Sequence, residues 1–97
     1  SPPPLSAKEA KEKILIILAE GDVIPTDHCQ DEMIEANADF QDVLSDLETG
    51  KISNHEWDEE HQNWKYRVVG ADIDGDDLTA ITVIVESEME LIIVTVF

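Results

Sequence analysis

Basic residues are scarce in this sequence. Its 97 residues include 6 Lys or Arg against 23 Asp or Glu, which gives a formal net charge of −17 at pH 7. Nucleic acids are bound through basic surfaces, so nucleic-acid binding by this chain is doubtful. The single cysteine, Cys29, excludes an internal disulfide bond and a zinc site built from several cysteines.

Long hydrophobic runs are also missing. The longest one, residues 14–19, is far too short to span a membrane. A secretory signal would carry a basic stretch before this run, and the sequence has none there. We therefore predict a cytoplasmic protein that does not bind membranes. Hydrophobic residues still make up 42% of the chain, and its length suits one domain, which we expect over 1–97.

The first part of the chain carries clear signals for an extended segment and a helix. Three consecutive prolines cannot be helical, so we expect an extended lead-in at 1–5. Ser6 and Glu9 have the spacing of a capping box, in which each side chain binds the other's neighbouring backbone N–H. They predict a helix over 7–20 that stops at Gly21.

Further helices are expected up to residue 50, which completes a helical part over 6–50. We interpret 22–25 as a connector and predict a second helix from Thr26 or Asp27 to about residue 36. Asn37 suits a left-handed terminating position, and Asp39 caps a stretch that ends at Gly50. This region is either two helices or one kinked helix.

The remaining chain, 51–97, changes to the alternating pattern of strands. Turn-forming residues separate its segments, and Gly75 can take a positive φ in one of these turns. The pattern predicts a β-meander with strands at 52–57, 64–70, 78–86 and 91–97. The fold class is therefore α+β: two to three N-terminal helices packed on a four-stranded antiparallel sheet.

The last predicted strand carries no charge over 92–97. Natural proteins cover or charge the edge strands of a sheet, because a bare edge pairs with other chains. If this strand lies at an edge, we expect it to pair with a second copy. A homodimer is therefore one of the expected partners.

The order of features from His28 onward also resembles a known pattern, in which a histidine opens a helix and a methionine follows five residues later. The matching pieces are His28, Met33, Val43-Leu44, Gly50-Lys51-Ile52, Val68-Val69-Gly70, 72–75, Leu78 and Val94-Thr95-Val96. This order resembles an uncharacterised toxin-like domain family of the RelE/ParE type, in the ribonuclease fold group that includes barnase and colicin nucleases. The resemblance covers about residues 28–97.

The resemblance implies a helix pair on a four-stranded antiparallel sheet and, in active relatives, RNA cleavage without a metal or cofactor. His28 aligns with the family's leading histidine, while Arg67 and Thr95 fall at its strand positions. These three are the catalytic residues that the resemblance suggests. The family pattern usually carries arginine just before the methionine, where this chain has Glu32.

Several residue groups have both a functional and a structural interpretation. His28 could act as an acid or base, or simply pack near its helix terminus. His55, His61 and the carboxylates between them could ligate a metal, but a solvated hairpin tip is the stronger interpretation, so we expect no metal. The acidic turn at 72–77 has its glycine at a different position from that of a calcium-binding loop, which favours a hairpin turn.

Three smaller features also remain open in the sequence. Lys65 and Arg67 share one strand face and could form an anion pocket, although ion pairs with carboxylates are favoured. Trp57 and Trp64 form either an exposed binding pair or a cross-strand packing pair. We expect Cys29 to be a buried structural thiol.

Three functions follow as hypotheses. The first is a toxin-like domain that is catalytically weak or inactive and binds a protein partner. The second is a metal-independent ribonuclease of a toxin–antitoxin system, with His28, Arg67 and Thr95 in its cleft. The third is an acidic interaction module that mimics nucleic acid, because residues 27–61 hold 12 acids and one base. Whether the chain is an enzyme is thus left open.

Overall fold

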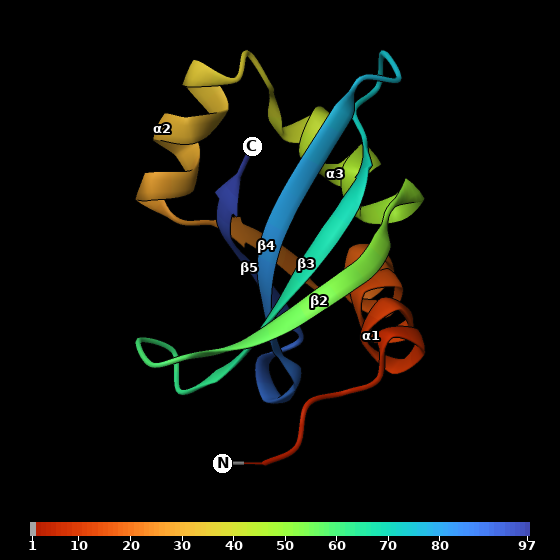
Figure 1. Cartoon of the computed structure of the whole chain (residues 1–97), viewed down its shortest axis with the longest axis vertical. Coiled ribbons are helices and arrows are strands. Elements are labelled where there is room, and N and C mark those ends of the chain that lie inside the picture. The colour runs from red at the N-terminus through yellow and green to blue at the C-terminus, as the bar shows by residue number, and fades with distance from the viewer. Residues whose placement is uncertain (1) are drawn as a thin grey trace.

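The structure of the chain is a computed structural model that describes residues 2–97 (Figure 1). Ser1, the first residue of the expected lead-in, lies outside the described residues. Besides one short 3-10 helix (Glu86–Glu88), the described part has three α-helices and five strands. In chain order these are α1 (Ala7–Glu20), β1 (Asp22–Pro25), α2 (Asp27–Glu35), α3 (Phe40–Thr49), β2 (Lys51–Asp58), β3 (Asn63–Ala71), β4 (Asp77–Val85) and β5 (Glu90–Val96). The α+β class predicted from the sequence is therefore confirmed.

The capping signals of the helices act as predicted. Ser6 Oγ accepts the Glu9 backbone N–H, and Glu9 Oε1 accepts the Ser6 N–H, both at 3.1 Å. Asn37 takes a left-handed conformation with φ of 54° between α2 and α3. Asp39 then caps α3 through its side chain. The region after residue 26 is therefore two helices rather than one kinked helix.

The sheet differs from the predicted four antiparallel strands. Its order is β1-β5-β4-β3-β2, and β1 pairs parallel with β5 while the other pairs are antiparallel. The interpretation of 22–25 as a connector is thus wrong. This strand has four residues and ends in Pro25, which an edge strand tolerates. Its partner begins only at Glu90, so no local pattern indicates the pairing.

The last strand does not lie at an edge of the sheet. β5 runs between β1 and β4. Just past β1, Thr26 donates its backbone N–H to Ile93 O at 3.0 Å and its hydroxyl to Val94 O at 3.1 Å. The condition for the predicted pairing with a second copy, a free edge at this strand, is therefore not met, and the homodimer stays a prediction.

One face of the sheet forms the core with α1 and α3, which lie together on that side in Figure 1. We call the opposite side the open face. Register and alternation place Arg67 on the open face, while its neighbours Tyr66 and Val68 are buried in the core. The core contains Ala10, Ile14 and Ile17 of α1, Val43 and Leu47 of α3, and Val68, Ala80, Ile84, Leu91, Ile93 and Val96 of the sheet.

Within residues 2–97, no helix has the length and hydropathy needed to cross a membrane.

Candidate functional site

The open face brings two of the three suggested catalytic residues into one row. Thr95 of β5 pairs with Ile81 of β4, and Ile81 pairs with Arg67 of β3. Laterally paired residues point to the same face of a sheet. Since neighbouring strands lie about 4.8 Å apart, the Arg67 and Thr95 backbones are separated by roughly 10 Å.

The third residue, His28, approaches Thr95 through Glu32. His28 Nε2 lies 3.3 Å from Glu32 Oε1, and the same oxygen accepts a hydrogen bond from Thr95 Oγ1. The His28 side chain is 71% exposed and that of Glu32 is 26% exposed. The structure therefore joins His28 and Thr95 around a carboxylate. The sequence marks Glu32 as a departure from the family pattern but gives no sign of these contacts.

Arg67 is engaged by an aromatic ring rather than by a carboxylate. Its guanidinium carbon lies 5.4 Å from the centroid of the Phe97 ring, which is within the range of a cation–π interaction. Within residues 2–97, neither Arg67 nor Lys65 belongs to an ion pair, so the ion-pair interpretation is wrong. Both line a hollow of about 40 Å³ with Asn54, Glu56 and Ile81, which is large enough for a water molecule but not for a nucleotide.

The cations of the second half of the chain gather on the open face. Lys51 pairs with Val69, which by alternation shares the face of Arg67 and Lys65. These three are all of the Lys and Arg residues that follow Lys13 in the sequence. The open face of β2 and β3 is thus locally cationic in a chain of net charge −17. Finding this requires the strand register, which the sequence alone does not provide.

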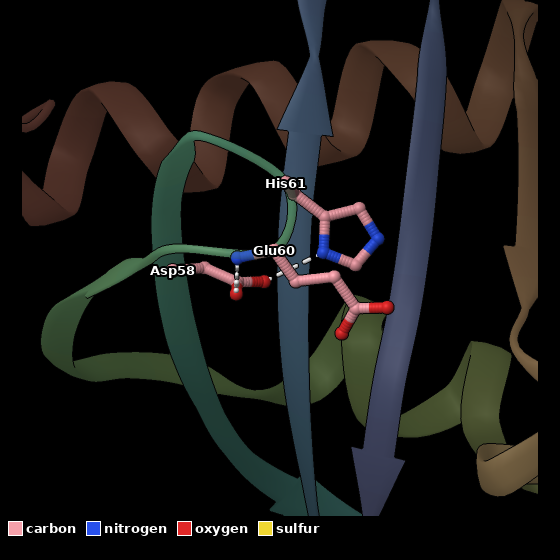
Figure 2. A group of neighbouring side chains, drawn as sticks. All are labelled: Asp58, Glu60 and His61. Carbon is pink, nitrogen blue, oxygen red and sulfur yellow. Dashed lines mark hydrogen bonds and ion pairs between the residues drawn. The ribbon is translucent and has the colours of Figure 1, made fainter.

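The β2–β3 hairpin ends in a carboxylate–imidazole pair (Figure 2). His61 Nδ1 lies 2.6 Å from Asp58 Oδ2, and Asp58 Oδ1 accepts the Glu60 backbone N–H at 3.0 Å. Burial raises the pKa of Asp58, but these hydrogen bonds and the charges of His61 and Lys65 outweigh burial, so the pKa lies below its usual value. The pair fixes the turn.

The same hairpin offers one metal-ligand atom each from Asp58, Glu60 and His61, and the three atoms lie within 4.8 Å of one another. Figure 2 shows the imidazole turned toward Asp58, while its other nitrogen points away. His55, the other histidine considered from the sequence, is not part of this group. It packs edge-on against Trp64, with 5.4 Å between the ring centroids.

Three structural interpretations from the sequence are confirmed. The acidic segment is a turn in which Asp72 N–H binds Asp76 O, and Gly75 has a φ of 89°. Trp57 and Trp64 are a cross-strand pair with ring centroids 5.5 Å apart. Cys29 is fully buried, and burial together with the charge of Glu32 raises its pKa to about 11, which suits an unreactive thiol.

Asp46 of α3 is a buried carboxylate that sequence reasoning missed. It is fully buried, and within residues 2–97 neither of its side-chain oxygens has a hydrogen-bond partner of normal geometry. Burial raises its pKa to about 7, although the nearby Gly70 backbone N–H and the charge of Lys11 act in the opposite direction. Its place in the apolar stripe between Val43 and Gly50 is the signal that could have revealed it.

Sequence reasoning also missed Lys11 of α1, whose side chain caps the C-terminal end of α3. Its ammonium group donates hydrogen bonds to Leu47 O at 2.7 Å, Glu48 O at 2.8 Å and Gly50 O at 2.6 Å. These carbonyls belong to the negative end of the helix dipole and have no partners within the helix. Lys11 therefore joins the two helices that cover the core.

Comparison with known proteins gives a family but no function. No curated protein and no solved structure matches the chain. Residues 25–97 match a family described as a domain of unknown function, DUF4258. The match begins at Pro25, the last residue of β1, runs through β5, and covers more than half of the chain. It includes the open face of β2 to β5. This chain therefore belongs to the DUF4258 family.

Proposed function

We propose that this chain is a RelE/ParE-like toxin-type domain that acts by binding a protein partner through its open face and cleaves RNA weakly or not at all. The observation that carries this proposal is the position of Glu32. Its carboxylate accepts the hydrogen bond of Thr95 and lies 3.3 Å from the imidazole of His28.

A carboxylate at this position disfavours RNA cleavage. Cleavage without a metal requires an acid or base for the 2′-hydroxyl and a cation that stabilises the charge on phosphorus. Glu32 places negative charge between His28 and Thr95, where it repels a phosphate. Arg67, the one cation among the three candidates, lies beyond β4 and against Phe97.

The same face has the composition of a protein-binding surface. Phe97 is 58% exposed and lies against Arg67, and Val69 is 44% exposed and pairs with Lys51. Apolar area supplies the binding free energy of an interface, while charges select and orient the partner. A partner segment with acidic and apolar side chains fits this face. The rest of the surface of this chain is negatively charged and would repel such a segment.

The test measures binding to the protein encoded by the gene next to this one. Isothermal titration of that protein is compared for the unchanged chain, Arg67→Glu and Lys8→Glu. The first substitution is on the open face, and the second makes the same charge change on an exposed position of α1. We expect Arg67→Glu to weaken binding at least about tenfold, while Lys8→Glu changes it little. Equal affinities for the two variants, or no binding by any of the three, would contradict the proposal.

A further inference from the structure

The proline-rich lead-in lies against aromatic side chains of β3. Trp64 donates its indole Nε1–H to Pro2 O at 2.7 Å, and the Leu5 backbone N–H donates to Tyr66 Oη at 2.8 Å. The segment between them has no helix or strand structure. In Figure 1 it is the coil that leads from the N-terminus to α1. The lead-in is therefore held at both ends by hydrogen bonds to aromatic side chains.

The aromatic side chains that receive it are fixed in place. Trp57 and His55 both pack edge-on against the Trp64 ring, with centroid distances of 5.5 and 5.4 Å. The Tyr66 side chain belongs to the core, and the residue is only 3% exposed. A donor held in a fixed orientation loses little conformational entropy when it binds a ligand. Trp64 and Tyr66 thus form a preorganised surface.

These contacts match a known mode of peptide recognition. Proline has no backbone N–H and a fixed φ, so proline-rich segments adopt an extended helix whose carbonyls are free to accept hydrogen bonds. Such segments dock between aromatic side chains and lose little conformational freedom in doing so. The bond from the Trp64 indole to Pro2 O is a contact of this kind.

Space remains beside the lead-in. A hollow of about 180 Å³ is lined by residues of the lead-in and of the sheet region, which are Pro2, Pro3, Leu5, Asn63, Trp64, Tyr66, Ile84 and Glu86. The lead-in therefore only partly fills the surface against which it lies. A proline-rich segment with larger side chains has room to make further contacts here.

We propose that the groove formed by Trp64 and Tyr66 is a binding site for a proline-rich segment of another protein, and that residues 2–5 fill it within the chain itself. A tethered segment of this length has an effective concentration in the millimolar range. A free peptide must compete with it, so weakening the internal contact exposes the site. This site is separate from the open face, because Trp64 and Tyr66 point to the side that carries the core.

The experiment uses the full chain and a variant in which Pro2, Pro3 and Pro4 are all replaced by Gly. Acetyl-Pro-Pro-Pro-Leu-amide is titrated into each, and the two indole N–H signals are followed by nitrogen-15 NMR. We expect a saturable shift of the Trp64 signal, with at least roughly tenfold tighter binding to the glycine variant. Introduced into that variant, Trp64→Phe removes both the donor and the reporting signal, so its binding is measured by isothermal titration calorimetry and should be about fivefold weaker. Phe40→Leu, which removes an exposed aromatic ring of α3 outside this hollow, is the control and should change binding little.

Two results would overturn the proposal. One is the absence of a saturable shift of the Trp64 signal. The other is an equal shift with acetyl-Ala-Ala-Ala-Leu-amide, which has the same length but lacks the prolines. If the glycine variant does not fold, the same pair of peptides is titrated into the unchanged chain at higher concentration. Displacement of the lead-in by the proline peptide alone then supports the proposal, and any other result contradicts it.

Discussion

Thr95 at the end of β5 donates a hydrogen bond to Glu32 of α2, and this bond links residues 63 positions apart in the chain. The acceptor oxygen is the one that lies 3.3 Å from His28 Nε2. The bond fixes α2 against the end of the sheet, and the Glu32 carboxylate thereby contacts two of the residues that the family resemblance suggests for catalysis, Thr95 and His28. The chemistry proposed for the open face follows from this contact.

The first prediction concerns the stability that this bond provides. Thr95→Val keeps the shape of the side chain but removes the donor, so the free energy of unfolding should fall by about 1–2 kcal/mol in urea denaturation. Thr79→Val on β4 is the control, since within the described residues the Thr79 hydroxyl makes no side-chain hydrogen bond. Equal effects of the two substitutions would show that the Glu32 contact is not stabilising.

Lys11 provides the second prediction. Lys11→Met retains most of the aliphatic stem but leaves the carbonyls of Leu47, Glu48 and Gly50 without their shared donor. We expect a loss of about 2–3 kcal/mol in the free energy of unfolding. Lys8→Met, at an exposed position of the same helix, should cost much less. A loss at Lys11 no larger than that at Lys8 would contradict the assigned role.

The third prediction follows from the buried Asp46. Its pKa is raised to about 7 in the folded chain against an ordinary value of 3.8, so the folded state holds a proton that the unfolded state has released. Its contribution to stability should therefore fall as pH rises from about 4 to 7, by up to about 1 kcal/mol per pH unit, and then level off.

Asp46→Asn removes this titration and provides the measurement. The difference in free energy of unfolding between Asp46→Asn and the unchanged chain should shift in favour of the variant between pH 5 and pH 8. Comparing the two proteins at each pH cancels the titration of the other carboxylates. A difference that does not change with pH would mean that Asp46 stays ionised in the folded chain.

Asp58 should behave in the opposite way. Its pKa is lowered in the folded chain, so the stability that it contributes is present above the unfolded pKa, near 4, and is lost as pH falls through the folded value. At pH 6, the free energy of unfolding of Asp58→Asn should be about 1–3 kcal/mol lower than that of the unchanged chain. This difference should shrink toward pH 3. An equal difference at both pH values would exclude the carboxylate charge as its source.

Local signals in the sequence predicted the helices well. The capping box of Ser6 and Glu9 acts over three residues, and the left-handed Asn37 ends α2 by its own backbone preference. Such interactions are complete within a few residues, so the sequence contains them in readable form. The predicted strands after residue 50 also match β2 through β5, with ends that differ by one residue.

Long-range pairing could not be predicted in the same way. β1 becomes a strand because β5 provides a parallel partner, and nothing near Pro25 indicates it. A register shift in β2 between Ile52 and Asn54 places Asn54, rather than Ser53, opposite Arg67. The composition of the open face depends on this register. The contact of Glu32 with Thr95 likewise exists only once α2 has docked beside β5.

Incubation of the isolated chain with RNA shows whether the residues around Glu32 can cleave it. The unchanged protein is incubated with single-stranded RNA in buffer containing a chelator, and the RNA fragments are resolved by gel electrophoresis. We expect little or no cleavage above that in buffer alone, because the Glu32 carboxylate contacts His28 and Thr95 and repels phosphate. Efficient cleavage by the unchanged chain that is lost in His28→Ala would contradict this expectation.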